Sequence, residues 1–347
     1  MTDERLRSLD QFRGYTVAGM FLVNYIGGFH VVAPVLKHHN TYCSYADTIM
    51  PQFFFAVGFA LRLTFLRRKE RDGTHKAVSH AIWRDLGLIL LGVVWYHLDG
   101  KVQTWTELQG LGLQGVMTRA FLKSPFQTLT SIGVTSLWVL PVIGASASVR
   151  VGYLIISSIL HLVLSHAFYF DWSWHHVIDG GPLGFLTWSI PVLVGSLTFD
   201  VMNSQKSDWF ARLILGSLGL MTLGIVLSRI GGEFSWPFVE TTKPPNLWTM
   251  SQRTGSVTYL TFSTGFSLLV YLLFVFACDR GRMDVGMFGL LGRNALAAYL
   301  VHSVVAEAMK PYTPKDSPAW YVVASFGLYF AISCLFVQHL EKRGARV

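Results

Sequence analysis

Long apolar runs, separated by shorter polar segments, extend along almost the whole chain. A membrane-spanning helix needs about 20 mainly apolar residues, and about ten of these runs come close to that length. The pattern therefore predicts an all-α fold, a polytopic transmembrane helical bundle of about ten spanning helices, with a range of roughly nine to eleven because some runs are short. The expected spans are 14–33, 49–66, 82–98, 128–147, 151–170, 184–199, 209–228, 256–278, 286–306 and 319–339.

The composition agrees with this pattern. Of the 347 residues, 52% are hydrophobic and 14% are charged, and the mean hydropathy is +0.42. Soluble domains carry about 25% charged residues. A soluble fold of this size could not cover so much apolar surface, whereas lipid tails can. Residues 1–347 are expected to form a single transmembrane domain, because no internal repeat, low-complexity tract or soluble segment divides the chain.

The net charge of +8 bears mainly on topology. Cytoplasmic loops of membrane proteins are rich in Lys and Arg. The densest basic cluster lies at 67–76, and an N-in, C-in arrangement puts this cluster and most of the 28 Lys and Arg residues on the cytoplasmic side. The lipid bilayer is the expected partner. A nucleic acid is not expected, because the basic residues do not gather on one folded face, and a homo-oligomer is left open.

The loops expected outside the membrane are the longer ones, and residues 101–123 are expected to add an interfacial or re-entrant helix. This segment contains Gly110-Leu111-Gly112-Leu113-Gln114-Gly115, which spells G-x-G-x-x-G. A dinucleotide site needs that string between a strand and a helix. No strand pattern precedes it, so we interpret it as a coincidence. The three cysteines have neither metal-ligand nor disulfide spacing and are interpreted as inert.

Polar side chains at membrane depth are costly to bury and are functional candidates by default. Asp10 and Arg13 are three residues apart, which puts them on one face of a helix. They form either a helix cap with an interfacial ion pair or the cytoplasmic entrance for an anionic cofactor. Asn24 is expected near the middle of the first span or slightly outward, where it either bonds another helix or faces a ligand. The glycines that follow it permit close approach of either.

Two adjacent histidines, His38 and His39, lie in the first external loop and are followed by Asp47. Histidine has the only unperturbed side-chain pKa near neutrality, which suits a general base. Asp47 could orient the base. The alternative is an ordinary solvated loop. No metal is predicted, because no pair of histidines at i and i+4 joins the cluster.

Arg293, Asn294 and His302 fall within the expected span 286–306. Asn294 and His302 are eight residues apart, close to one helical face. They either hold helices together or contribute to a binding site. Further polar residues are interpreted mainly as loop or interface residues. They are Asp171, His175, His176, Asp179, His161 and His166.

Several of these segments, taken in order, resemble the heparan-alpha-glucosaminide N-acetyltransferase family and its bacterial relatives, which are membrane-bound acyltransferases that use acetyl-CoA. The resemblance touches both ends and the middle of the chain, and residues 85–170 add little to it. The segments are 5–14 (RLRSLDQFRG), 23–25 (VNY), 37–38 (KH), 46–47 (AD), 51–55 (PQFFF), Gly58, 179–184 (DGGPLG) and 292–302 (GRNALAAYLVH).

The resemblance implies a catalytic histidine in the first non-cytoplasmic loop, at His38, with Asn24 beside it. The sequence departs from the family pattern because the distance from histidine to Asp47 is one residue shorter and His39 follows directly, so either histidine could be the base. The large lumenal domain of the animal enzymes is absent, which makes heparan a doubtful substrate. A bacterial cytoplasmic (inner) membrane location is implied.

The function that follows is transfer of an acetyl or other acyl group from cytoplasmic acyl-CoA to an amine or hydroxyl of an extracytoplasmic sugar or glycan. By resemblance, acetyl-CoA enters as a co-substrate from the cytoplasmic side. Transfer is either direct, with a loop histidine as general base, or through an acyl-histidine intermediate. The residues expected at the cofactor are Asp10, Arg7, Arg13, Asn294, Arg293 and His302.

A small-solute transporter or permease is the alternative function. Such proteins also bury His, Asn and Asp at mid-membrane. They often carry matched halves with Gly- or Pro-broken helices. The chain shows no matched halves, which argues mildly against a transporter.

Overall fold

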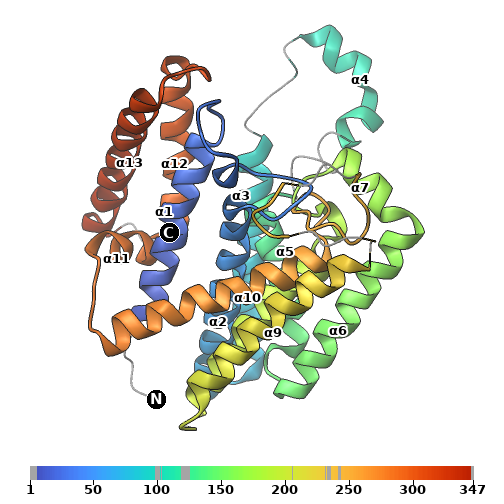
Figure 1. Ribbon diagram of the computed structural model, residues 1–347, viewed down its shortest axis with the longest axis vertical. Helices are drawn as coiled ribbons and strands as arrows, with labels where there is room; N and C mark the ends of the chain where they lie inside the picture. The colour runs from blue at the N-terminus through green and yellow to red at the C-terminus, as the bar shows by residue number, and fades with distance from the viewer. Residues whose placement is uncertain are drawn as a thin grey trace.

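The computed structural model describes residues 6–97, 102, 104–118, 126–204, 206–230, 232, 236–240 and 244–344. In these ranges the chain forms helices and no strand, so the predicted all-α class is confirmed. Figure 1 shows a helical bundle from which α4 stands apart. The α-helices are α1 (Arg7–Ile26), α2 (Tyr45–Asp72), α3 (Thr74–His97), α4 (Trp105–Thr118), α5 (Thr128–Ile143), α6 (Ala147–Leu164), α7 (Phe170–His176), α8 (Phe185–Asn203), α9 (Trp209–Arg229), α10 (Val257–Phe274), α11 (Gly286–Arg293), α12 (Ala295–Met309) and α13 (Ala319–Lys342).

Seven helices in the described part of the chain are long and apolar enough to cross a membrane, and the bent pair α11 and α12 makes up to eight. The chain is therefore a multi-pass membrane protein. The two expected spans outside this set correspond to α1 and α5. At 16 residues α5 is short, and the 20 residues of α1 include the polar side chains of Asp10, Arg13 and Asn24.

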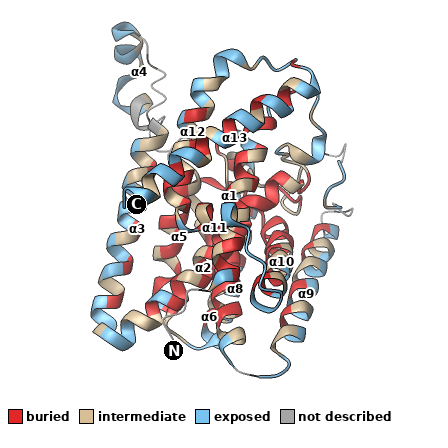
Figure 2. Cartoon of the chain, turned by 90° about the vertical axis from the view of Figure 1, so that its left-hand side faces the viewer, coloured by how far each residue is buried: buried red, intermediate tan, exposed pale blue. Residues whose placement is uncertain are grey.

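The spanning helices form a central group and a peripheral group. In α2, α8 and α10, 61%, 72% and 61% of the apolar window is buried inside the protein, against 22% in α3 and 17% in α9. Figure 2 shows the same contrast, with buried residues concentrated in the middle of the bundle. Large apolar side chains project from the peripheral helices. They include Leu90, Ile156, Leu215 and Val323, each more than 60% exposed. These faces are suited to contact lipid, because an apolar face that is not covered by protein is stable only in an apolar solvent.

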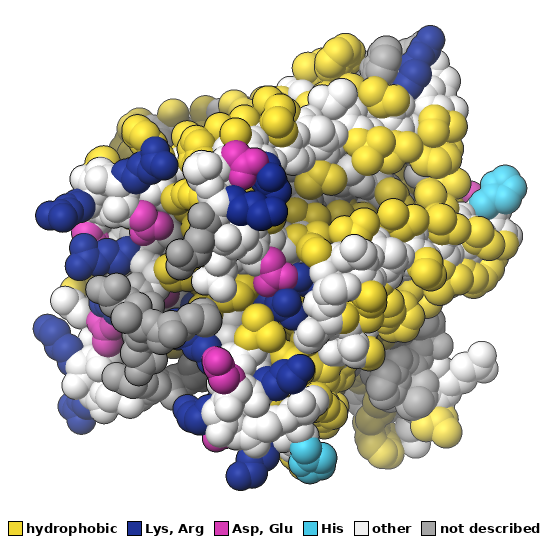
Figure 3. Space-filling view, turned by 90° about the horizontal axis from the view of Figure 1, so that it is seen from below, with side chains coloured by type: hydrophobic (Ala, Val, Ile, Leu, Met, Phe, Trp, Pro, Cys, Tyr) yellow, Lys and Arg dark blue, Asp and Glu magenta, His cyan; other side chains and the backbone are white. Residues whose placement is uncertain are grey.

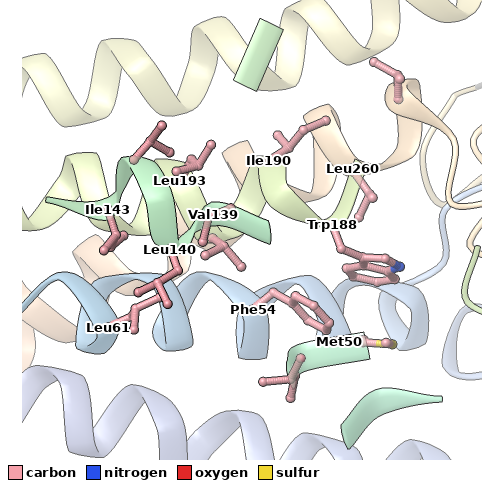
Figure 4. Close-up of a cluster of buried hydrophobic side chains, with 14 of the residues drawn as sticks. Met50, Phe54, Leu61, Val139, Leu140, Ile143, Trp188, Ile190, Leu193 and Leu260 are labelled. Atoms are coloured by element: carbon pink, nitrogen blue, oxygen red, sulfur yellow. The ribbon is translucent and has the colours of Figure 1, made fainter. Parts of the chain in front are cut away.

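The central contact is between α2 and α8. A side chain at Gly58 would come within 1.9 Å of the Val192 carbonyl oxygen, so only glycine permits the two backbones to approach so closely. Towards one end of this contact, Phe54 stacks on Trp188 with ring centroids 4.4 Å apart. Figure 4 shows both rings in a cluster of buried apolar side chains from α2, α5, α8 and α10. The rigid core thus fixes Trp188, whose position matters for the site described below.

A buried ion network joins three helices at the other end of α2. Asp200 of α8 accepts hydrogen bonds from Arg62 of α2 at 3.0 and 3.1 Å, and it also accepts one from Arg150 of α6. The Arg150 side chain is fully buried and donates to Ser196 at 2.7 Å. No pattern in the sequence marks these residues. Two buried guanidinium groups around one carboxylate are stable only while the carboxylate compensates them.

The end of the bundle at which α1 begins is rich in charge. Figure 3 looks onto this end and shows Lys and Arg side chains gathered on one side of it, with Asp and Glu among them and apolar side chains on the other. We refer to it as the charged end. The opposite end carries the connecting segments 27–44, 177–184 and 244–256, which converge there (Figure 1). We refer to it as the loop end.

Two expected spans differ from the structure. The first was expected over 14–33, but α1 covers Arg7–Ile26 and residues 27–33 lie in a loop. The span expected over 286–306 is two helices, α11 and α12, bent by 96°. Asn294 leaves the helical conformation at the break, with φ −118° and ψ 34°. Just before it, Gly292 packs against α1 so closely that a side chain there would lie 1.9 Å from the Asp10 carbonyl oxygen.

A helix expected within 101–123 is present as α4. Its Gly112 has φ 58° and kinks it. The G-x-G-x-x-G string therefore lies inside a helix rather than between a strand and a helix, which agrees with its rejection as a dinucleotide site.

Candidate active site

A cavity of about 410 Å³ opens at the loop end. That volume falls within the roughly 300–1,000 Å³ that is typical of small-molecule sites. Apolar side chains of α1 and α2 form its floor, and polar groups from several loops and helices form its walls. The polar lining residues are Asn24, His38, His39, Asn40, Asp47, Gln127, Thr128, Asp179, Gln252, Arg253 and Tyr299. The structure thus brings together the four expected catalytic residues, Asn24, His38, His39 and Asp47.

Asp47 is held rigidly because it belongs to the capping box of α2. The backbone N–H of Asp47 donates to the hydroxyl of Ser44, and the Asp47 carboxylate accepts from the backbone and hydroxyl of Ser44 at 3.0 and 2.9 Å. The backbone N–H of His39 donates to the same carboxylate oxygen at 3.3 Å. The Asp47 side chain is only 1% exposed. A capping box satisfies helix N-terminal donors, and here it also fixes the direction in which the second carboxylate oxygen points.

That second oxygen binds His38. Nδ1 of His38 lies 2.9 Å from Oδ1 of Asp47. Because an ionised carboxylate only accepts hydrogen bonds, Nδ1 is the donor and Nε2 carries the lone pair when the ring is neutral. The His38 side chain is 48% exposed, and it lines the cavity. The arrangement is that of a general base oriented by a buried carboxylate.

Electrostatics around His38 favour its protonated form. Burial lowers the pKa of His38, but the hydrogen bond to Asp47 and the charges of Asp47 and Asp179 outweigh it, so that the pKa lies above its ordinary value. Burial also raises the pKa of Asp179, although its hydrogen bond with Gln252 and the charge of His38 act in the opposite direction. Shifted pKa values in groups that line one cavity are typical of functional sites.

His39 is directed differently. Its Nε2 lies 2.9 Å from the carbonyl oxygen of Pro34, and its ring stacks on Tyr42 at 4.3 Å. Tyr42 is itself buried. His39 therefore holds the fold of loop 27–44, and the structure distinguishes the two histidines that sequence analysis left as alternatives. Only His38 has a carboxylate on its ring nitrogen.

Two distant loops complete the site, and little in the sequence pattern indicates them. The Gln252 amide donates to Asp179 at 2.7 Å, and Nε1 of the core residue Trp188 donates to the Asp179 carbonyl oxygen at 2.8 Å. Asp179 has φ 53°, which is uncommon for a residue other than glycine and often marks a functional site. The only sequence signal was the DGGPLG string, and Gln252 lay in a loop with no pattern of its own.

Asn24 and Tyr299 line the cavity from helices. Asn24 is exposed to it near the end of α1, and its amide has no hydrogen-bond partner among the described residues. The Tyr299 hydroxyl of α12 lies 2.8 Å from that of Tyr96 in α3, which accepts from the backbone N–H of Leu129 at 2.9 Å. Asn24 thus presents unused hydrogen-bonding groups to any ligand in the cavity.

The residues expected at the cofactor do not line this cavity. Asp10 and Asn24 are separated by about 21 Å along α1, at 1.5 Å per residue. Arg293 binds Glu341 at 2.9 Å, and the Asn294 amide donates to the same carboxylate at 3.1 Å. Both lie beside the first turns of α1, near Asp10. Asp10, Arg293 and Asn294 are therefore at the opposite end of α1 from Asn24 and the cavity.

The remaining members of the cofactor set are dispersed. Arg7 is exposed at the start of α1, and Arg13 lies further along the same helix. His302 is 5% exposed and stacks on Phe21 at 5.2 Å, with Nδ1 directed at the Tyr299 carbonyl oxygen. It lies behind the cavity wall rather than in it. Within the described ranges, no group of three or more His, Cys, Asp or Glu side chains is arranged to hold a metal ion.

Comparison of the chain with protein-family models and with curated proteins gave no match.

Proposed function

We propose that this protein is a membrane-bound acyltransferase. It moves an acetyl or other acyl group from acyl-CoA to an amine or hydroxyl of a saccharide on the far side of the membrane. The observation that supports the proposal most directly is the 2.9 Å contact between His38 and Asp47 at the wall of a cavity that is accessible from the loop end. The order of segments that resembles the heparan-alpha-glucosaminide N-acetyltransferase family supports it independently.

In the proposed reaction, His38 acts as the general base. Its Nε2 takes the proton from the acceptor amine or hydroxyl as that group attacks the thioester carbonyl carbon. The carbon–sulfur bond then breaks, the CoA thiolate leaves, and it recovers the proton from His38. The products are an N-acyl or O-acyl sugar and free CoA. Asp47 holds the base in the required tautomer and stabilises the imidazolium that forms.

Asn24 is proposed to stabilise the oxyanion of the tetrahedral intermediate. Its amide is in the cavity and has no protein partner in the described ranges, so it can donate to a developing negative charge. One such donor is typically worth about 3–4 kcal/mol of transition-state stabilisation. The donor is ready before substrate binds, because no contact within the protein has to break first.

Acyl-CoA is proposed to enter from the charged end. A cavity of about 410 Å³ suits a sugar and the thioester tip of the pantetheine arm, and the phosphoadenosine end requires a basic surface elsewhere. Arg7 and Arg13 near the start of α1 fit this role, since Arg recognises phosphate. Arg293 and Asn294 both donate to Glu341.

The proposal includes the topology. With N-in and C-in orientation and about ten spans, counting α1 and α5, the charged end faces the cytoplasm and the loop end faces outward. The basic character of the charged end supports this orientation (Figure 3). The bacterial cytoplasmic membrane is the proposed location, where acyl-CoA and an extracytoplasmic glycan meet on opposite sides of one bilayer.

One observation favours the alternative of a small-solute transporter. Helices α11 and α12 are bent by 96° at Asn294, and broken helices with polar groups at the break are typical of transporter binding sites. In this protein, however, the break lies beside the start of α1, and the oriented histidine lies at the other end of that helix.

Release of free CoA from proteoliposomes separates the two functions. Purified protein is reconstituted with acetyl-CoA on one side and a panel of amino sugars and neutral sugars on the other, and thiol release is measured together with uptake of radiolabelled sugar. The acyltransferase proposal predicts acceptor-dependent CoA release and a modified sugar. Flux of unmodified sugar without CoA release would instead identify a transporter.

The pH dependence of the reaction follows from the environment of His38. A general base must be unprotonated, so a raised pKa moves the acidic limb of kcat/KM to higher pH, with its midpoint above 6.5. Because Asp47 is a cause of the raised pKa, Asp47→Asn should move the limb to lower pH while it lowers the maximal rate. A kcat/KM profile between about pH 5 and pH 9 for both proteins measures this. A limb that stays in place in the variant would contradict the coupling of His38 to Asp47.

A further inference from the structure

Arg253 is an unpaired cation in the wall of the active-site cavity. It lies in loop 244–256, directly after Gln252, and no acidic side chain in the described part of the chain forms an ion pair with it. Its Nε is buried and has no hydrogen-bond partner. The side chain as a whole is half-buried, and a buried N–H without a hydrogen-bond acceptor is costly, because its lost hydration is not replaced. The Nε of Arg253 is therefore suited to donate to a bound ligand.

The position of Arg253 is nevertheless well defined. Nη1 donates to the carbonyl oxygen of Trp174 at 3.1 Å, and the guanidinium carbon lies 6.0 Å from the centre of the Trp174 ring. The backbone carbonyl of Arg253 accepts from the N–H of Gly180 at 2.9 Å. At this contact a side chain on Gly180 would meet the backbone of Gly255 at 3.3 Å, so the two loops pack closely. The guanidinium group is held in place while part of it stays free to bind.

The acidic groups of the cavity do not neutralise Arg253. The Asp47 carboxylate is occupied by His38, His39 and Ser44. Asp179 is bound to Gln252, and its burial disfavours the charged form. Among the described residues that line the cavity, Arg253 is therefore an arginine whose charge is available to a ligand, on the loop that also supplies Gln252.

We propose that Arg253 determines acceptor specificity by binding an anionic group, a carboxylate or a phosphate, that the acceptor sugar carries near the amine or hydroxyl to be acylated. The planar guanidinium fork matches both groups in a bidentate manner. The inference rests on the proposed acyltransferase function and adds to it the chemical class of the acceptor, which is an acidic sugar rather than a neutral one.

Three sugars that share one amine test the proposal. Glucosamine is neutral apart from the amine, muramic acid adds a carboxylate, and glucosamine 6-phosphate adds a phosphate. With CoA release as the assay, kcat/KM of the wild type should be about tenfold or more higher for one of the acidic sugars than for glucosamine, in line with the strength of a charge-assisted hydrogen bond. The preferred sugar identifies the anionic group.

Variants of Arg253 then test whether this residue causes the preference for an acidic sugar. Arg253→Gln should remove it, and Arg253→Lys, which keeps the charge but not the fork, should retain part of it. Arg229→Gln is the matched control, because Arg229 is exposed at the end of α9 and does not line the cavity. That control should keep the full preference. Equal kcat/KM for all three sugars in the wild type, or a preference that survives in Arg253→Gln, would overturn the proposal.

A binding measurement separates this proposal from the failure of the acyltransferase function itself. The thermal unfolding midpoint of the protein in detergent micelles is measured with each sugar and without acetyl-CoA. If no sugar supports CoA release, but an acidic sugar stabilises the wild type and not Arg253→Gln, the acyltransferase assignment fails and the anion site at Arg253 stands. If no acidic sugar stabilises the wild type more than glucosamine does, the anion site fails.

Discussion

Replacement of His38 with Ala is expected to lower the rate of acyl transfer by about 10²- to 10⁴-fold, the usual contribution of a positioned general base. The reason is that Nε2 of His38 is the ring nitrogen that the Asp47 contact leaves free at the cavity. His39→Ala should lower the rate far less, because that ring binds the Pro34 carbonyl oxygen and has no carboxylate partner. CoA release in proteoliposomes at saturating acetyl-CoA measures both.

The rates of the two histidine variants can be compared only if both variants are folded. Membrane insertion and the thermal unfolding midpoint should be the same in His38→Ala as in the wild type, since the ring is half exposed and α2 keeps its capping box. Asn24→Ala provides a third point, with a lower kcat and little change in KM if the amide acts on the oxyanion. Wild-type turnover in His38→Ala, or an equal loss in His39→Ala, would refute the assignment of the base.

Asp200→Ala is expected to destabilise the folded bundle by about 3–5 kcal/mol, as for removal of one partner from a buried ion pair. The substitution leaves the buried guanidinium groups of Arg62 and Arg150 without a carboxylate, and Arg150 is fully buried. Because the three side chains come from α2, α6 and α8, the loss should loosen the centre of the bundle rather than a single helix. Unfolding in mixed micelles with increasing denaturing detergent measures the change.

Asp208→Ala is the matched control for Asp200→Ala. Asp208 also pairs with an arginine, at 2.7 Å from Arg212, but both side chains are half exposed in that pair. Solvent screening makes exposed pairs weak contributors to stability, so the unfolding transition of Asp208→Ala should coincide with that of the wild type. Coincident transitions for Asp200→Ala as well would mean that the network around Asp200 is not a source of stability.

Hydropathy predicted the positions of the helices well, because the length of an apolar segment indicates whether lipid or water surrounds it. Every expected span contains a helix, and the multi-pass architecture is confirmed. Each error has a specific physical cause. The helix at the N-terminus begins at Arg7 because a helix can extend past the apolar run into polar residues, and it ends at Ile26 before Gly27 and Gly28. The break at Asn294 depends on the contact of Gly292 with α1, which is a tertiary contact that a window of sequence does not contain.

The candidate site likewise contains contacts that the sequence could predict and contacts that it could not. His38 and Asp47 are nine residues apart, and a polar pair at that short separation is visible in the sequence. Gln252 and Asp179 are 73 residues apart, and each lies in a loop that looks ordinary by itself. The Arg62 and Asp200 pair spans 138 residues. Such pairs are decided by helix packing, so the sequence pattern alone could not reveal them.

The double role of Asp47 has a practical consequence for trapping a bound complex. An inactive protein is the usual means to hold substrate in place, and both members of the base pair are obvious targets. Asp47 is a poor choice, because its carboxylate also closes the first turn of α2 and holds the backbone of His39. A change there would disturb the cavity wall that the ligand is meant to occupy. His38 takes no part in the capping box, so its replacement is expected to stop acyl transfer and leave the cavity intact.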